Sequence, residues 1–171
     1  MSLNCKLTLV LGHAASGKSR FAEKHAIAYG YVRTYVATAR ILDKEMQSKV
    51  VAHRADRGAD WALVECDRDL ARVCSQARDR EVWLIDCATM WLTNLMMDEA
   101  EWRQAAEAWI AAMAASPGRF VVVSNDVGGG VTPDNALARR FQREQGALNQ
   151  MLAEAADGVA LVTAGLPQWL K

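Results

Sequence analysis

The sequence has no excess of charge of either sign, because 20 Lys and Arg residues balance 20 Asp and Glu residues over 171 positions. Nucleic acids and anionic membranes are bound through a surplus of Lys and Arg on one face, so this balance argues against both as partners. No apolar run approaches the ~20 residues that cross a bilayer, and the first residues lead into a strand-like segment without the features of a signal peptide. We therefore expect a cytoplasmic protein without a membrane span.

Cysteine and proline are also scarce, with four and three residues respectively. Cys5, Cys66, Cys74 and Cys87 form no CxxC pair and have no metal-ligand spacing. We therefore expect reduced thiols, and neither disulfides nor structural zinc. No repeat, low-complexity segment or linker interrupts the chain. We expect a single domain over residues 1–171, a length that ordinarily forms one hydrophobic core.

Strand-like and helix-like segments alternate along the chain. Short apolar runs predict strands at 6–11, 34–37, 63–65, 82–86, 119–124 and 159–163. Longer segments of helical composition predict helices at 19–29, 43–57, 67–78, 99–115 and 134–156. This alternation indicates an α/β protein with a mostly parallel sheet and helices on both faces.

The strongest motif lies between the first predicted strand and the first predicted helix. The pattern G-x-x-x-x-G-K-[ST] is matched there by Gly12, His13, Ala14, Ala15, Ser16, Gly17, Lys18 and Ser19. In such a loop the backbone N–H groups and the helix N-terminus bind phosphates, Lys18 reaches the β- and γ-phosphates, and the Ser19 hydroxyl ligates Mg²⁺. The motif predicts a nucleotide site in a P-loop NTPase-type, RecA-like fold.

Polar residues follow two further predicted strands. Asp86 ends the 82–86 strand, and a P-loop enzyme needs a carboxylate near its metal at the end of a neighbouring buried strand. We favour this Mg²⁺-side role, the alternative being that Asp86 caps the following helix. The 124–130 segment, Ser-Asn-Asp-Val-Gly-Gly-Gly, is expected at the same sheet edge. It is either part of the ligand site or a simple turn.

His53 lies in the predicted 43–57 helix, next to Arg54 and near Arg57. A helical histidine beside an arginine is more often a surface or half-buried residue than a nucleophile. Its chemistry offers another role, because an imidazole can attack the α-phosphorus of a nucleoside triphosphate and expel pyrophosphate, with both arginines binding the displaced phosphates. The residues alone leave both interpretations open.

Ordered sequence blocks extend along nearly the whole chain. The longer ones lie at 12–20, 35–39, 41–46, 53–57, 86–95, 124–128, 133–135 and 139–141. Shorter ones are Trp61, Glu65, Gly146, 149–150 and 156–157. From about residue 7 to residue 171, these blocks resemble the bifunctional adenosylcobinamide kinase / adenosylcobinamide-phosphate guanylyltransferase family of cobalamin biosynthesis.

The resemblance implies two reactions: phosphorylation of adenosylcobinamide with GTP or ATP, and transfer of GMP from GTP to adenosylcobinamide phosphate. It implies that His53 is the residue that becomes covalently guanylylated, and that the protein forms homo-oligomers. The GTP contacts implied by the resemblance fall on the P-loop and on Ala37, Thr38, Ala39, Arg54, Ala55, Asp56, Arg57, Glu65 and Asp86.

The chain departs from the family pattern at two positions. Asp126 stands where the family usually has Glu, and Thr132 where an aliphatic residue is usual. Both departures bear on how the corrinoid is held and leave the matched nucleotide residues intact.

Two further sets of side chains have a structural and a functional interpretation. Helical spacing predicts a packing stripe rather than a corrinoid platform for Trp102, Trp109 and Met113, and phosphate contact and a solvated helix face are equally compatible with Arg139, Arg140 and Arg143.

Two other functions are compatible with the loop motif alone: a single-function kinase for another small metabolite, in which His53 is structural, and a regulatory module that binds GTP as a signal.

The charge distribution favours nucleotide chemistry in the first third of the chain. Residues 1–57 contain 10 Lys and Arg against 4 Asp and Glu, residues 58–118 contain 5 against 11, and residues 119–171 contain 5 of each.

Overall fold

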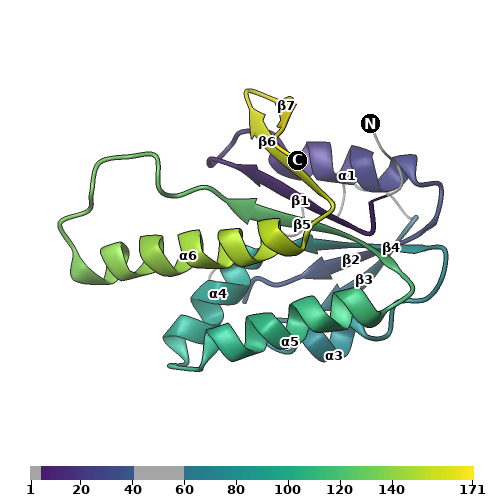
Figure 1. The fold of residues 1–171 in the computed structure, drawn as a ribbon, viewed down its shortest axis with the longest axis horizontal. Helices are drawn as coiled ribbons and strands as arrows, with labels where there is room; N and C mark the ends of the chain where they lie inside the picture. The colour runs from purple at the N-terminus through teal and green to yellow at the C-terminus, as the bar shows by residue number, and fades with distance from the viewer. Residues whose placement is uncertain (1–4, 41–59) are drawn as a thin grey trace.

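Among residues 5–40 and 60–171, which the computed structural model describes, seven strands form one sheet in the order β3-β2-β4-β5-β1-β6-β7 (Figure 1). Five neighbouring pairs are parallel, and β6–β7 is antiparallel. The strands are β1 (Leu7–Gly12), β2 (Val32–Ala37), β3 (Trp61–Glu65), β4 (Glu81–Asp86), β5 (Arg119–Asn125), β6 (Gly158–Thr163) and β7 (Leu166–Trp169).

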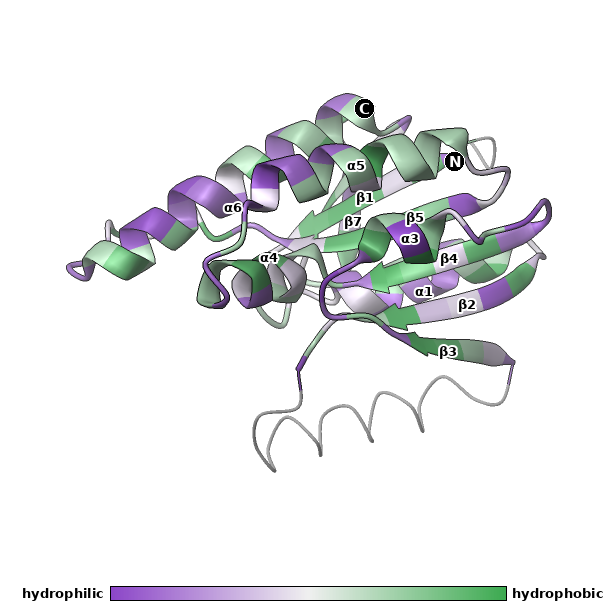
Figure 2. Ribbon diagram, turned by 90° about the horizontal axis from the view of Figure 1, so that it is seen from below, coloured by the Kyte–Doolittle hydropathy of each residue, from purple (hydrophilic) through white to green (hydrophobic). Residues whose placement is uncertain are grey.

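Helices cover both faces of this sheet (Figures 1 and 2). Helix α1 (Lys18–Ala28) packs against β1, β4, β5 and β6 on one face. The helices of the opposite face are α3 (Leu70–Cys74), α4 (Ala88–Met97), α5 (Trp102–Ala115) and α6 (Ala136–Ala155). None of the helices in the described ranges is long and apolar enough to cross a membrane.

Alternating strand residues feed the two halves of the core. In β1, Leu9 packs into the cluster under α3 to α6, whereas Val10 packs into the cluster under α1. The same alternation places Phe120 and Val121 of β5 on opposite faces. Strands buried on both sides need apolar residues at nearly every position, which is why the central strands appear as continuous hydrophobic runs in the sequence.

The predicted strands at 6–11, 82–86, 119–124 and 159–163 agree with β1, β4, β5 and β6 to within one or two residues. The helices predicted at 19–29, 99–115 and 134–156 correspond to α1, α5 and α6, and the one at 67–78 shortens to α3. The Trp102, Trp109 and Met113 stripe is buried in the core on α5, as predicted. The predicted 43–57 helix lies outside the described residues.

Two elements were not predicted. Helix α4 lacks an amphipathic signal because its buried residues include Trp91, Leu92 and Asn94 in sequence proximity, and its N-cap, Cys87, makes no side-chain capping bond. Strand β7 is short, exposed and contains Pro167, which a sheet tolerates at its edge. The β6–β7 turn uses Ala164 and Gly165, both at positive φ (52° and 79°), which suits a two-residue hairpin turn.

The carboxyl ends of the parallel strands meet at one sheet edge. Gly12 of β1 pairs with Asn125 of β5, and Ala37 of β2 pairs with Asp86 of β4. Because β5 lies between β1 and β4, Asp86 is one strand further from the P-loop than the expected neighbouring strand. The shared direction of the strands nevertheless brings it to the same edge.

Replacement of Leu84 by Ala should be strongly destabilising. Leu84 is fully buried in β4, a central strand, and packs in the cluster under α1. Loss of a buried leucine side chain costs about 2–5 kcal/mol through lost burial and the cavity that remains. Urea unfolding of Leu84→Ala measures this loss, and Val32→Ala, at an exposed strand position, should change the free energy of unfolding by less than about 1 kcal/mol. Equal effects of the two changes would contradict the burial pattern.

Candidate active site

The P-loop connects β1 directly to α1. The backbone turns through Ala15 and Gly17, at φ values of 56° and 89°, and the Ser16 N–H donates to the His13 carbonyl at 3.2 Å. Gly17 is the N-cap of α1, and no side chain caps the helix there. The first N–H groups of α1 therefore remain available for an anion, which the helix dipole also favours.

Glycine is required at two positions of this loop by close packing. A Cβ on Gly12 would meet the Ser16 side chain and lie 2.7 Å from the Val162 carbonyl oxygen. A Cβ on Gly17 would lie 3.0 Å from Gly165 Cα, and the Gly165 N–H donates to the Ser16 carbonyl at 2.7 Å. The β6–β7 turn thus supports the loop from behind.

Ser16 and Lys18 have the environment that a phosphate site requires. The Ser16 hydroxyl is buried and has no hydrogen-bond partner among the described residues, which fits a group that bonds to a ligand oxygen. The Lys18 ammonium donates to the His13 carbonyl at 3.2 Å, so it already lies across the loop. His13, Ala14 and Ala15 are exposed at the tip.

Asp86 lies at the end of β4 with its carboxylate held in place. The Tyr35 hydroxyl donates to Asp86 Oδ2 at 3.0 Å. Burial raises the pKa of the adjacent Cys87 thiol to about 11. The hydroxyl of Ser19 and the Asp86 carboxylate are hard oxygen donors of the kind that Mg²⁺ prefers, so the residues present fit that ion.

The nucleotide contacts predicted at 37–39 and at Glu65 lie where β2 and β3 end, at the same carboxyl edge of the sheet. Thr38 is completely buried, and its hydroxyl donates to the Cys87 carbonyl and accepts from the Cys87 N–H, both at 2.7 Å. That side chain therefore ties β2 to β4, and its half-buried neighbours Ala37 and Ala39 are the residues nearer the surface. Glu65 is the exposed last residue of β3 and pairs with Ala37.

The segment after β5 contacts the P-loop. The Asp126 N–H donates to the Gly12 carbonyl at 3.1 Å, and the His13 Nδ1–H donates to the Asp126 carbonyl at 2.9 Å. A carbonyl only accepts, which assigns the proton to Nδ1.

Helix α6 holds this segment in place. Asn149 Nδ2 donates to the Asn125 carbonyl at 3.0 Å, and Gln142 Nε2 donates to the Val127 carbonyl at 2.9 Å. Asn149 and Gln142 carry no sequence signal as supports of the site, because their partners lie far away along the chain. Arg139 donates to the Pro133 and Asp134 carbonyls, so its guanidinium stabilises the chain that leads into α6.

A charged cluster occupies the carboxyl edge beyond β2. Arg40 donates through Nε to Asp67 at 2.6 Å and through both terminal nitrogens to Asp98, at 2.8 and 2.6 Å. Arg68 lies 3.1 Å from the same Asp98 carboxylate. The bidentate hydrogen bonds from Arg40 hold the pKa of Asp98 below its ordinary value. Arg40, which follows β2, therefore binds the chain just after β3 and just after α4.

The predicted nucleophile His53 and the predicted GTP contacts Arg54, Ala55, Asp56 and Arg57 lie outside the described residues. Among the described residues, the P-loop, Asp86, the 37–39 segment and Glu65 all lie at the carboxyl edge of the sheet, spread over the strands from β1 to β3.

A family model described as cobinamide kinase / cobinamide phosphate guanyltransferase matches residues 8–170. The chain belongs to this family. It is 42% identical over 166 residues to the bifunctional adenosylcobalamin biosynthesis protein CobP of Pseudomonas aeruginosa, covering 95% of this chain and 96% of the relative. It is 38% identical over 176 residues to the bifunctional adenosylcobalamin biosynthesis protein CobU of Salmonella typhimurium, covering 94% and 97%.

Solved structures support the fold. Flagellar accessory protein FlaH of Methanocaldococcus jannaschii superposes with a TM-score of 0.54 at 12% identity, over 97% of this chain and 78% of that chain. An ATPase domain superposes with a TM-score of 0.50 at 10% identity, over 91% and 68%. At such identities the likeness concerns the fold alone, and it confirms the expected RecA-like P-loop architecture.

The Arg40 cluster should give the stability of the protein a distinct pH dependence. A carboxyl group whose pKa is lowered on folding stabilises the folded state above its ordinary pKa, and this contribution is lost as the pH falls through the lowered value. The difference in urea midpoint between wild type and Asp98→Asn should thus be present at neutral pH and shrink as the pH falls below 3.8, the ordinary pKa of Asp98. Asp60→Asn, which removes an exposed partner of Arg33, should have less effect. A difference that is constant with pH would contradict this role for the cluster.

Proposed function

We propose that the single domain formed by residues 1–171 catalyses both reactions for which its family is named. The chain first phosphorylates the hydroxyl of the aminopropanol arm of adenosylcobinamide with GTP or ATP. It then transfers GMP from a second GTP to the resulting phosphate and yields adenosylcobinamide-GDP. The observation that carries the proposal is a complete P-loop at the carboxyl edge of the sheet, in a chain that matches the family over nearly its full length.

In the kinase step the acceptor hydroxyl attacks the γ-phosphorus, the bond to the β-phosphate oxygen breaks, and the nucleoside diphosphate leaves. Lys18 and the N–H groups at the start of α1 stabilise the negative charge on the transferring group. The buried Ser16 hydroxyl, which has no partner among the described residues, donates to a phosphate oxygen. Ser19 and Asp86 would hold Mg²⁺, which supplies further charge neutralisation when bound.

In the guanylyl step the neutral imidazole of His53 attacks the α-phosphorus of GTP and expels pyrophosphate. The phosphate of the acceptor then attacks the same phosphorus and releases His53. A covalent intermediate divides one displacement between two phosphate groups into two easier steps. Arg54 and Arg57, close to His53 in the sequence, would bind the displaced pyrophosphate. We further propose that the enzyme works in the cytoplasm as a homo-oligomer; the free, buried state of all four cysteines suits a reducing compartment.

Lys18→Ala should lower kcat/KM for cobinamide phosphorylation by about 10²–10³, the usual effect of losing one preorganised group that stabilises the transition state. Steady-state assays with γ-labelled GTP and ATP measure this change. Lys24→Ala removes an exposed lysine elsewhere on α1 and should leave the rate unchanged. Undiminished phosphorylation by Lys18→Ala would overturn the assignment of the P-loop.

Incubation with α-labelled GTP should label the wild-type protein with an acid-labile, alkali-stable phosphoramidate. His53→Ala should not be labelled, although His13 and His25 remain, and should still bind GTP. Labelling should fall as the pH drops below roughly 6.5, because only neutral imidazole is nucleophilic. A wild-type protein that phosphorylates cobinamide without ever acquiring the label would be a single-function kinase.

A further inference from the structure

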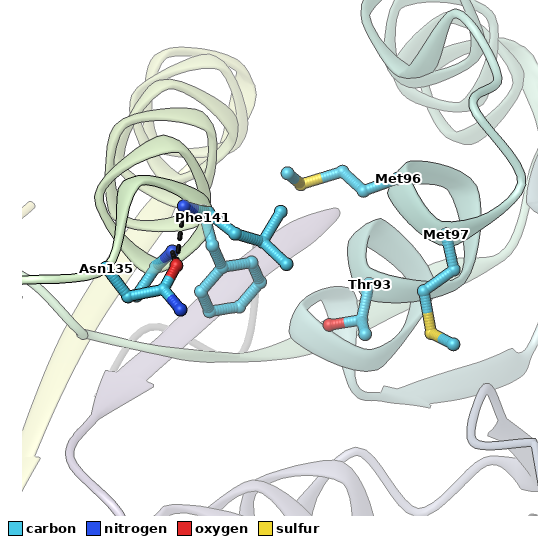
Figure 3. A pocket seen from close by; sticks show the side chains of 7 residues that line it. Thr93, Met96, Met97, Asn135 and Phe141 are labelled. Carbon is cyan, nitrogen blue, oxygen red and sulfur yellow. Dashed lines mark hydrogen bonds between the residues drawn. The ribbon is translucent and has the colours of Figure 1, made fainter.

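An apolar pocket opens between α4 and the start of α6, with a volume of about 610 Å³. Helix α4 contributes Thr93, Met96 and Met97, and helix α6 contributes Leu137 and Phe141. Figure 3 shows Thr93 and Met96 pointing toward Phe141 across this space. Its volume falls within the range that holds small organic ligands.

Two side-chain oxygens of the pocket wall are already bonded within the protein. The Thr93 hydroxyl donates to the Thr89 carbonyl at 2.9 Å. Asn135 Oδ1 accepts from the N–H groups of Leu137 and Ala138 at 2.7 and 3.3 Å (Figure 3). The pocket therefore presents thioether, methyl and ring surface, which suits an apolar ligand and does not suit a phosphate.

The apolar surface of this region reaches solvent. Met97 is 63% exposed and Leu137 is 66% exposed. Exposed apolar residues that line one pocket mark a binding site more often than single scattered ones do.

A second cavity of about 440 Å³ adjoins the pocket, because Met96 lines both. Its other lining side chains include Glu99, Glu101, Arg140, Arg103 and Glu144, the last two paired at 3.1 Å. The two cavities form one surface with an apolar half and a hydrogen-bonding half. Such a surface fits a ligand that has apolar faces and a polar rim.

The pocket and the nucleotide site are built from the same two connections. The segment between β5 and α6 contacts Gly12 and His13 through Asp126 at one end, and reaches the pocket at Asn135 at the other. Helix α4 begins at Ala88, two residues after Asp86, and carries the opposite pocket wall. A ligand in the pocket would therefore lie beside the carboxyl edge at which the phosphoryl group is transferred.

We propose that this pocket binds the corrin ring of the cobinamide acceptor, an assignment that rests on the function proposed above. A corrin ring is broad, with methyl-bearing apolar faces and amide side chains at its rim. Its apolar face would contact Met96, Met97 and Phe141, and its amides would reach the polar cavity past Met96. The hydroxyl arm extends from the ring and would approach the nucleotide along the segment that starts at Asp126.

Met97→Lys and Leu137→Lys test the assignment, because both side chains are exposed and neither change should disturb folding. An ammonium group placed against an apolar ring face is desolvated without a partner. We expect the KM for cobinamide to rise at least about tenfold in each variant, with kcat at saturating cobinamide within about twofold of wild type. GTP binding and labelling by α-labelled GTP should not change. Ile27→Lys, at an exposed position of α1 on the opposite face, is the matched control and should behave as wild type.

Equilibrium dialysis with cobinamide, detected by its visible absorbance, measures the same affinity without any turnover. Weaker binding in both pocket variants but not in Ile27→Lys supports the assignment. Unchanged KM and unchanged dialysis would overturn it, even if the wild type is an active kinase. Sedimentation of the wild type and the three variants tests whether the pocket instead binds a second copy of the chain. If a pocket variant changes its assembly state and regains affinity for cobinamide at high protein concentration, the pocket is an interface between copies and the assignment is wrong. A wild type that binds cobinamide without phosphorylating it would contradict the proposed function and leave the pocket assignment standing.

Discussion

The parallel hydrogen bonding of β1, β5 and β4 is the constraint on which the site depends. It fixes Gly12 opposite Asn125 and Asp86 opposite Val123, so that the P-loop and the segment after β5 begin at one level and Asp86 lies two residues further back along the same edge. Both faces of these strands are buried under helices, and a shift of one residue in register would move each side chain to the opposite face and disrupt both halves of the core. The polar groups of the site are thus held by the same contacts that hold the fold, which is the preorganisation that charge stabilisation needs.

The C-terminal hairpin extends this constraint to the back of the P-loop. Gly165 donates to the Ser16 carbonyl, and the Val162 carbonyl lies where a side chain at Gly12 would have to be. The loop can present its N–H groups to a ligand because the carbonyls of Gly12 and Ser16 already accept hydrogen bonds and the space beside Gly12 and Gly17 is filled by the hairpin. A sequence motif therefore functions here only with a turn that lies nearly 150 residues further along the chain.

Local patterns predicted the elements and residues whose signals are local. The P-loop, the position of Asp86 after a buried strand and the packing stripe on α5 all depend on residues close together in the sequence, and the fold class follows from their alternation. Helix α4 and strand β7 were missed because one is apolar on most sides and the other is a short exposed edge. The pairing of Arg40 with Asp98 and of Asn149 with the Asn125 carbonyl joins residues 58 and 24 positions apart, and no periodicity signals such contacts. The role of His53 came from the family resemblance, and the residue lies outside the described structure.

The balanced net charge of the chain has a spatial meaning. The P-loop side offers Lys18 and the positive end of α1, whereas the polar cavity next to the apolar pocket carries three carboxylates against two guanidinium groups. A triphosphate is attracted to the first region and gains little from the second. A cationic acceptor has the opposite preference. The proposed function brings two substrates to one sheet edge, and this distribution of charge would direct them to different sides of it. A chain without net charge can do this because its positive and negative groups lie in different regions.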